Sequence, residues 1–272
     1  MLGKNLLLLA LVFLSAMPLL AQDKEAHDRL VAAHAQYYTP TASGLKSFQC
    51  EASIDWKAML SRFAGTDIPD DNPALKLLQT VHLSVTDDLH AGGSLQWTNP
   101  AEIPNERKAG LQQMQDGLQT SVVGFFQSWN AYMNGSMVPF PDRTVTVTPS
   151  GTGVHLSGSA KNTTFDEDFD KNMLLTQALV VSPSLKVLAT PTFKATPDGL
   201  VVSSVLSQVH QPPDAPEIDA TYRIEYAKVE SYQIPSRVIF DVKNAGLIEI
   251  GFSSCKVTVA DWAISKKAAP TL

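Results

Sequence analysis

Acidic side chains alternate between Asp166 and Asn172, and this stretch comes nearest to a metal-binding pattern. Oxygen ligands at every second position open a calcium-binding loop. The pattern then fails, because Lys171 stands where such a loop needs glycine and Gln177 where it needs glutamate. On a β-strand, every second residue lies on the same face. We therefore interpret these acids as the polar face of a strand and expect no metal ion.

The chain lacks the local patterns that accompany covalent catalysis. It has no Gly-x-Ser-x-Gly segment, and its six histidines never adopt the spacing of a zinc protease. A fold can still gather catalytic groups from distant positions. We expect a protein that is not an enzyme and uses no cofactor, with an exported hydrolase as the least favoured alternative. The side chains that such a hydrolase would have to bring together are Asp55, His82, His155 and Glu225.

The first 21 residues are organised like a secretory signal. Lys4 precedes an apolar run from Leu6 to Leu14, and Ser15, Ala16 and Pro18 follow before Leu19-Leu20-Ala21. We expect cleavage after Ala21, a periplasmic or secreted protein, and one mature domain over residues 22–272. No later apolar run has the length of a membrane-spanning segment.

Composition and charge are those of an ordinary globular protein. Hydrophobic residues make up 44% of the chain, which is enough for a sizeable core. The formal net charge is −6, so the chain has no positive surface of the kind that nucleic acid requires. We expect no nucleic-acid partner.

Cys50 and Cys255 are the only cysteines and lie near opposite ends of the mature chain. In an exported chain an even number of cysteines predicts a disulfide, with two separate buried thiols as the alternative. Strict alternation, however, places Cys50 on the apolar face of its strand and Cys255 on the polar face of its own. Three interpretations remain open: a β-bulge at Ser253-Ser254, a bridge on the outer surface, or a wrong pairing of the two strands.

Amphipathic helices are predicted where apolar residues recur at intervals of three and four. A short one runs from Asp23 to Tyr38, a brief helical piece follows over Ala58–Phe63, and one long helix runs from Glu106 to Asn134 with Gly135 as its stop. The stripe of the long helix is rich in methionine and aromatic residues. Such a stripe suits a helix packed on a sheet, and also a surface that receives a lipid or an apolar peptide.

Strands are predicted where apolar and polar residues alternate between turn residues. The first runs from Leu45 to Trp56, and Lys76–Thr86 pairs with Gly93–Trp97 as a hairpin. Nearly everything after Arg143 is strand, ending in a three-strand meander from Thr221 to Val257. The predicted fold class is therefore mainly β (α+β), a curved antiparallel sheet or incomplete barrel wrapped around the one long amphipathic helix.

A loose motif lies between Tyr226 and Ser236, with Val229, Tyr232 and the pair Ile234-Pro235. Followed by alternating strands, it resembles the C-terminal half of the bacterial lipoprotein-carrier superfamily, the LolA/LolB-like proteins. The order of elements, a helix, strands, one long helix and many strands, is also similar. The resemblance implies an envelope protein whose incomplete barrel surrounds a lid helix and an apolar cavity for acyl chains.

The resemblance implies a lipid or the acyl chain of an acylated protein as the partner, held between the sheet and the long helix. A filled core would use the same side chains, so the alternative is a structural or protein-interaction module of the envelope. The candidate ligand-binding residues are Leu118, Val122, Phe125 and Trp129 on the helix, and Trp56, Tyr222, Tyr226 and Phe240 on the sheet.

Overall fold

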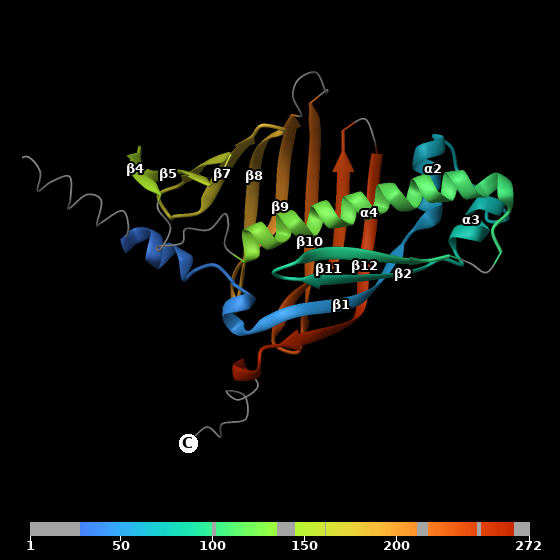
Figure 1. The fold of residues 1–272 in the computed structure, drawn as a ribbon, viewed down its shortest axis with the longest axis horizontal. Helices are drawn as coiled ribbons and strands as arrows, with labels where there is room; N and C mark the ends of the chain where they lie inside the picture. Colours follow the sequence, from blue (N-terminus) through green and yellow to red (C-terminus); the bar gives the residue numbers. More distant parts are fainter. Residues whose placement is uncertain are drawn as a thin grey trace, which may run out of the picture.

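A long helix lies across one antiparallel β-sheet in the computed structural model of the chain (Figure 1). The structure describes residues 28–99, 102–134, 145–160, 162–210, 217–243 and 246–263. The predicted signal segment, residues 1–21, lies outside the described residues, and so does Gly135, the predicted stop of the long helix.

Twelve strands form the sheet in the spatial order β3-β2-β1-β12-β11-β10-β9-β8-β7-β6-β5-β4. The sheet is open, because β3 and β4 are its two edges. The predicted mainly β, antiparallel fold class is thereby confirmed. The strands are β1 (Leu45–Ile54), β2 (His82–Asp88), β3 (Gly92–Thr98), β4 (Thr146–Ser150), β5 (Gly153–Ala160), β6 (Thr163–Phe169), β7 (Leu175–Ser182), β8 (Leu185–Thr196), β9 (Gly199–His210), β10 (Ile218–Val229), β11 (Tyr232–Val242) and β12 (Gly246–Val259).

The predicted meander and the predicted hairpin are both present. β10, β11 and β12 pair one after another, so that Phe240 lies opposite Tyr222 on one side and Ile248 on the other. β2 and β3 pair with each other over their whole length, from His82 opposite Thr98. Both arrangements join strands that follow each other along the chain, where short turns and alternation set the register.

Strand β12 connects the two parts of the sheet. Its first half pairs with β11 and its second half with β1. Within the pairing with β1, the register jumps from Gln49–Lys256 to Glu51–Ser253, so that two residues of β12 face one residue of β1. Ser254 there has a φ of 51°. This β-bulge bends the strand, and in Figure 1 β1 and β2 run at a steep angle to β9 and β10.

The bulge also settles how the two cysteines meet. It turns Cys255 towards Cys50, and the two form a disulfide with their Cα atoms 4.1 Å apart. The predicted disulfide is confirmed, and of the three interpretations the bulge at Ser253-Ser254 is the correct one. The bond ties β1 to β12 across 205 residues of sequence.

The long helix is one of several in the described part of the chain. α4 (Asn105–Met133) differs from its predicted bounds by one residue at each end. The early helix is described over residues 28–34 and ends sooner than predicted, since Tyr37 already forms a β-bridge with Leu200. The remaining helices are η1 (Thr41–Ser43), α2 (Trp56–Ala64) and α3 (Pro73–Leu78).

Trp56 begins α2, so its predicted place on the sheet is wrong. The predicted strand ends at Ile54. The Asp55 side chain then accepts a hydrogen bond from the Ala58 N–H at 2.9 Å, which caps the first turn of a helix. The N-cap outweighs the alternation that Trp56 continues in the sequence.

The predicted strand Lys76–Thr86 is helical in its first part. Asn72 accepts hydrogen bonds from the N–H groups of Ala74 and Leu75, and Pro73 occupies the first turn of α3. Proline suits that position, because its missing N–H would have no partner there. The strand therefore begins only at His82.

Aromatic rings of α4 pack against the middle of the sheet. Phe126 contacts Phe48 of β1 and Phe252 of β12, and Trp129 also contacts Phe48. These side chains are buried and belong to the main hydrophobic core. The core therefore lies between α4 and the strands β1, β12, β11 and β10.

Candidate functional site

The predicted ligand-binding residues of α4 lie within the packed core. Phe125 has three aromatic neighbours, Phe126, Tyr222 and Phe240, at centroid distances of 4.9, 6.2 and 5.8 Å. The space directly under the helix is thus occupied by side chains. The four predicted helix residues, Leu118, Val122, Phe125 and Trp129, are at most 2% exposed.

Tyr226 links the helix to the sheet through its hydroxyl. The Trp129 indole N–H donates to that oxygen at 3.0 Å, and the hydroxyl donates to the Val202 carbonyl at 2.7 Å. Burial raises the pKa of Tyr226 well above its ordinary value. The hydroxyl consequently stays protonated and acts as a fixed hydrogen-bonding group.

Trp56 lies away from the other predicted residues. Its ring meets that of Trp97 on β3 at 5.8 Å, where the start of α2 packs on the first hairpin. The fold therefore brings together seven of the eight predicted residues around α4 and β10–β11, and it places Trp56 near the edge strand.

A groove runs beside α4, where the helix passes over the ends of β10, β11 and β12. It has a volume of about 300 Å³. Its helix wall is made by Gly117 and Ser121, and a Cβ added at Gly117 would meet no atom within 4 Å. Phe63 of α2 forms another wall and is 59% exposed. The sheet side consists of Ala220, Thr221, Tyr222, Phe240, Asp241, Val242, Gly246 and Ile248.

A second cavity, of about 230 Å³, lies nearer the start of the helix and is lined by a separate set of residues. Gly110 and Met114 line it from α4, and Leu60 lines it from α2. Positions 110, 114, 117 and 121 share one face of an α-helix. We call these two cavities together the α4 groove, bounded by that face of α4 and by α2.

The α4 groove adjoins a larger crevice of about 840 Å³, with which the second cavity shares Leu77, Glu106 and Arg107. The crevice lies between α3, the open ends of β2 and β3, and the start of α4. We call it the polar mouth. Among the described residues, no ion pair joins its charged side chains to one another. These are Lys76, Arg107, Glu102 and Glu106, with His82 beside them.

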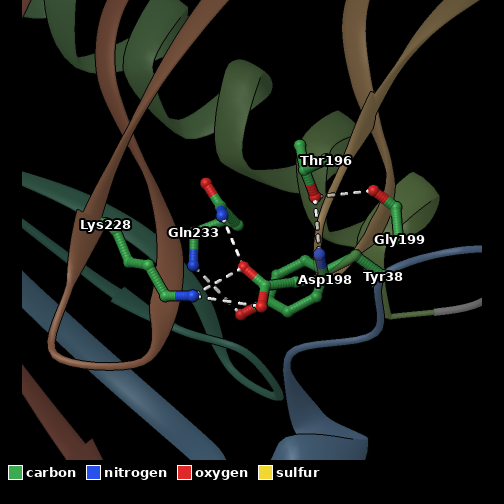
Figure 2. A network of polar contacts seen from close by, with 6 residues as sticks. All are labelled: Tyr38, Thr196, Asp198, Gly199, Lys228 and Gln233. Carbon is green, nitrogen blue, oxygen red and sulfur yellow. Dashed lines mark hydrogen bonds and ion pairs between the residues drawn. The ribbon is translucent and has the colours of Figure 1, made fainter.

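A polar network holds the opposite end of the sheet (Figure 2). Asp198, in the turn between β8 and β9, accepts hydrogen bonds from the Gln233 amide at 2.6 Å and from Lys228 at 3.0 Å. These two donors lower the pKa of Asp198. The Gln233 backbone N–H in turn donates to the Tyr38 hydroxyl. The network clips two turns and the N-terminal segment together, which is a structural role.

The residues considered for a hydrolase do not converge. His82 is on β2 and His155 on β5, and eight strands separate these two in the sheet. His155 instead contacts Asp168 of β6 at 2.8 Å, and Glu225 forms an ion pair with Arg237. Asp55 caps α2.

Two further kinds of site are absent from the described residues. No group of three or more His, Cys, Asp or Glu side chains there is arranged to hold a metal ion. In the same residues, no helix combines the length and the apolar composition needed to cross a membrane.

Comparison with protein-family models, with curated proteins and with solved structures gave no match to this chain.

Two features were not predicted, although the sequence contains a pattern that indicates each of them. Gly110, Gly117 and Gly124 repeat every seven residues, which places three residues without side chains near one face of a predicted helix. Asp87 follows Leu83 and Val85 at alternate positions, so alternation alone puts a carboxyl on an apolar face.

Proposed function

We propose that this chain is an exported, non-enzymatic protein that binds an amphiphile, a lipid or an acylated protein, in the α4 groove. The acyl chain lies along the Gly110–Ser121 face of α4, and its polar end reaches the polar mouth. The observation that carries this proposal is the open space beside Gly117, bounded by Tyr222, Phe240 and the exposed Phe63.

The dimensions of the α4 groove suit a linear apolar ligand. Ligand pockets commonly measure roughly 300–1,000 Å³ and have mainly apolar walls. Each CH₂ group taken out of water contributes about 0.8 kcal/mol. The tyrosine and phenylalanine rings of β10 and β11 supply the apolar wall, and Gly117 lets a chain approach the helix backbone.

The polar mouth provides charges for the end of the ligand. Lys76 and Arg107 suit a phosphate or carboxylate, and Glu102 and Glu106 suit an ammonium group. The disulfide is consistent with an oxidising, exported location. The resemblance to lipoprotein carriers, in which a helix covers an apolar site on an open barrel, gives the proposal further support.

Filling the groove tests the proposal. Gly117→Leu places a side chain in the open space and should weaken the binding of a dansyl-labelled fatty acid, followed by its fluorescence, at least tenfold. The same change removes a helix glycine, so it should raise stability by up to about 1 kcal/mol. Opposite effects on binding and stability separate a blocked site from a damaged fold.

Gln127→Leu is the matched control, because it adds the same side chain at an exposed position of α4. It should leave fatty-acid binding unchanged. Equal binding by Gly117→Leu and wild type would contradict the proposed site. The polar mouth has its own test: replacing Lys76 and Arg107 by serine should weaken dodecyl phosphate roughly tenfold and leave dodecanol unaffected.

The packed core under α4 favours a second candidate, a protein-interaction module of the envelope. Phe125 and Trp129 are buried, so the predicted ligand position directly under the helix is filled. The open sheet offers β3 and β4 as edges for a partner strand. Mass spectrometry of organic extracts from the purified native protein distinguishes the two, since copurified acyl lipid supports the first candidate and a lipid-free protein the second.

A further inference from the structure

Asp87 is a carboxyl group in the hydrophobic core. It lies on β2, on the same face as Leu83 and Val85, and it is 0% exposed. Its neighbours across the sheet are Phe48 on β1 and Gly93 on β3. The chain therefore places an acid where every adjacent strand supplies an apolar or small residue.

The only described hydrogen bond of this carboxyl comes from the C-terminal half of α4. The Asn130 amide donates to Asp87 Oδ1 at 2.9 Å, and the Asn134 amide donates to Asn130 Oδ1 at 2.9 Å. Asp87 Oδ2 and Asn134 Oδ1 are buried without a hydrogen-bond partner among the described residues. A buried acceptor without a donor is costly, and an ionised one more so.

No described cation compensates the acid. On α4, the facing residues Asn130 and Asn134 do not titrate, and on β1 the Lys46 side chain is exposed. The turn after β2 carries Asp88, whose carboxylate accepts hydrogen bonds from the backbone N–H groups that follow, and the exposed His90. Burial raises the pKa of Asp87 to about 7, with Asp88 adding to the rise and the Asn130 hydrogen bond opposing it.

We propose that Asp87 is a proton-operated latch that holds the C-terminal half of α4 on the β2–β3 hairpin. With its proton, the carboxyl is neutral and fits the apolar face. When the proton passes to water, the carboxylate is left with one hydrogen bond, and it regains solvent only if its cover moves. β2 is fixed between β1 and β3, so α4 is the part that lifts.

Opening of the latch would regulate the amphiphile-binding site, and this last step alone rests on the proposed function. Lifting the C-terminal half of α4 uncovers Phe125, Phe126 and Trp129, which widens the apolar surface next to the groove. The latch itself involves Asp87, Asn130 and the helix, and it can be tested without any ligand.

Hydrogen exchange of the α4 peptides, corrected for the intrinsic pH dependence of exchange, tests the latch. The equilibrium constant for opening of α4 should increase about tenfold per pH unit between pH 5 and 7 and level off above pH 7. The reason is that Asp87 loses its proton on opening over that interval. Asp87→Asn keeps the shape without the charge and should remove this increase. Asp88→Asn, at the neighbouring turn, should retain it.

Two outcomes would overturn the latch: a flat exchange profile in the wild-type protein, or an unchanged increase in Asp87→Asn. Should that variant not fold, carboxyl ¹³C NMR of the wild-type protein decides, since titration of Asp87 at its ordinary position near pH 4 contradicts the proposal. Gly117→Leu should keep the pH response, so a failure of amphiphile binding is recognised separately.

Discussion

At the scale of single residues, Tyr226 joins three elements through one oxygen atom. It accepts from Trp129 of α4 and donates to Val202 of β9, while its own strand is β10. Tyr226→Phe would leave the Trp129 N–H and the Val202 carbonyl without this partner. We expect a loss of about 1–3 kcal/mol of unfolding free energy, measured by urea denaturation. Tyr222→Phe removes a hydroxyl from the same strand, four residues earlier, and should cost less.

Phe125 tests how completely the core under α4 is filled. Its ring has three aromatic neighbours and is 1% exposed. Phe125→Ala should therefore lower the unfolding free energy by about 3–5 kcal/mol. If the position instead belonged to an open cavity, the variant would lose ligand affinity with little change in melting temperature, and that result would contradict the packing described above.

Asp87 makes stability depend on pH in the direction opposite to most acids. Its pKa in the folded protein, about 7, exceeds the ordinary 3.8, so the folded state retains a proton that the unfolded state has lost. The stabilisation is complete below pH 4 and disappears as the pH rises to 7, an effect of roughly 4 kcal/mol at most. The unfolding free energy of Asp87→Asn minus that of wild type should consequently increase from pH 4 to 7. A difference independent of pH would contradict this assignment.

At the scale of elements, the start of α2 depends on one cap. The Asp55 carboxylate accepts from the Ala58 N–H, so Asp55→Ala should cost about 1 kcal/mol. The change should also loosen the contact between the Trp56 and Trp97 rings, which tryptophan fluorescence can follow. Asp71→Ala, an exposed acid in the loop before α3, is the control and should change neither quantity.

Elements marked by a periodic pattern over many residues could be predicted, and element boundaries set by a single capping residue could not. The period of apolar residues in α4 and the alternation in β10–β12 identify both from local pattern alone. Trp56 was misplaced because one capping carboxylate ends the strand before it, and α3 was missed because Asn72 and Pro73 redirect an apolar run. A cap is a single-residue signal, and periodicity summed over a segment overlooks it.

The candidate site was predicted only in part, for a related reason. Alternation along their strands predicts apolar faces for Tyr222 and Phe240, and both residues line the α4 groove. A stripe of large side chains can form a filled core or the wall of an open groove. Which of the two occurs depends on how distant segments pack, and alternation within one strand does not predict that packing. The space itself follows from residues without side chains, such as Gly117.

At the scale of the whole molecule, the disulfide closes the longest loop between paired strands. In the chain-entropy view, joining residues 205 positions apart stabilises by about 5 kcal/mol at most. Replacing Cys50 and Cys255 together by alanine should lower the melting temperature strongly. A reducing agent should lower the melting temperature of the wild-type protein by a similar amount. A variant as stable as the oxidised protein would show that the β1–β12 pairing needs no covalent support.

The pairing of β1 with β12 also determines how late in synthesis the whole sheet can form. Among the described residues, the first and last strands lie side by side within the sheet, with the β2–β3 hairpin beyond β1. During synthesis, β1, β2, β3 and α4 are therefore made long before β12. The first three strands join the rest of the sheet only through β12. Such distant pairing slows folding. Until Val259 has emerged, the apolar face of α4 has no finished sheet to cover it.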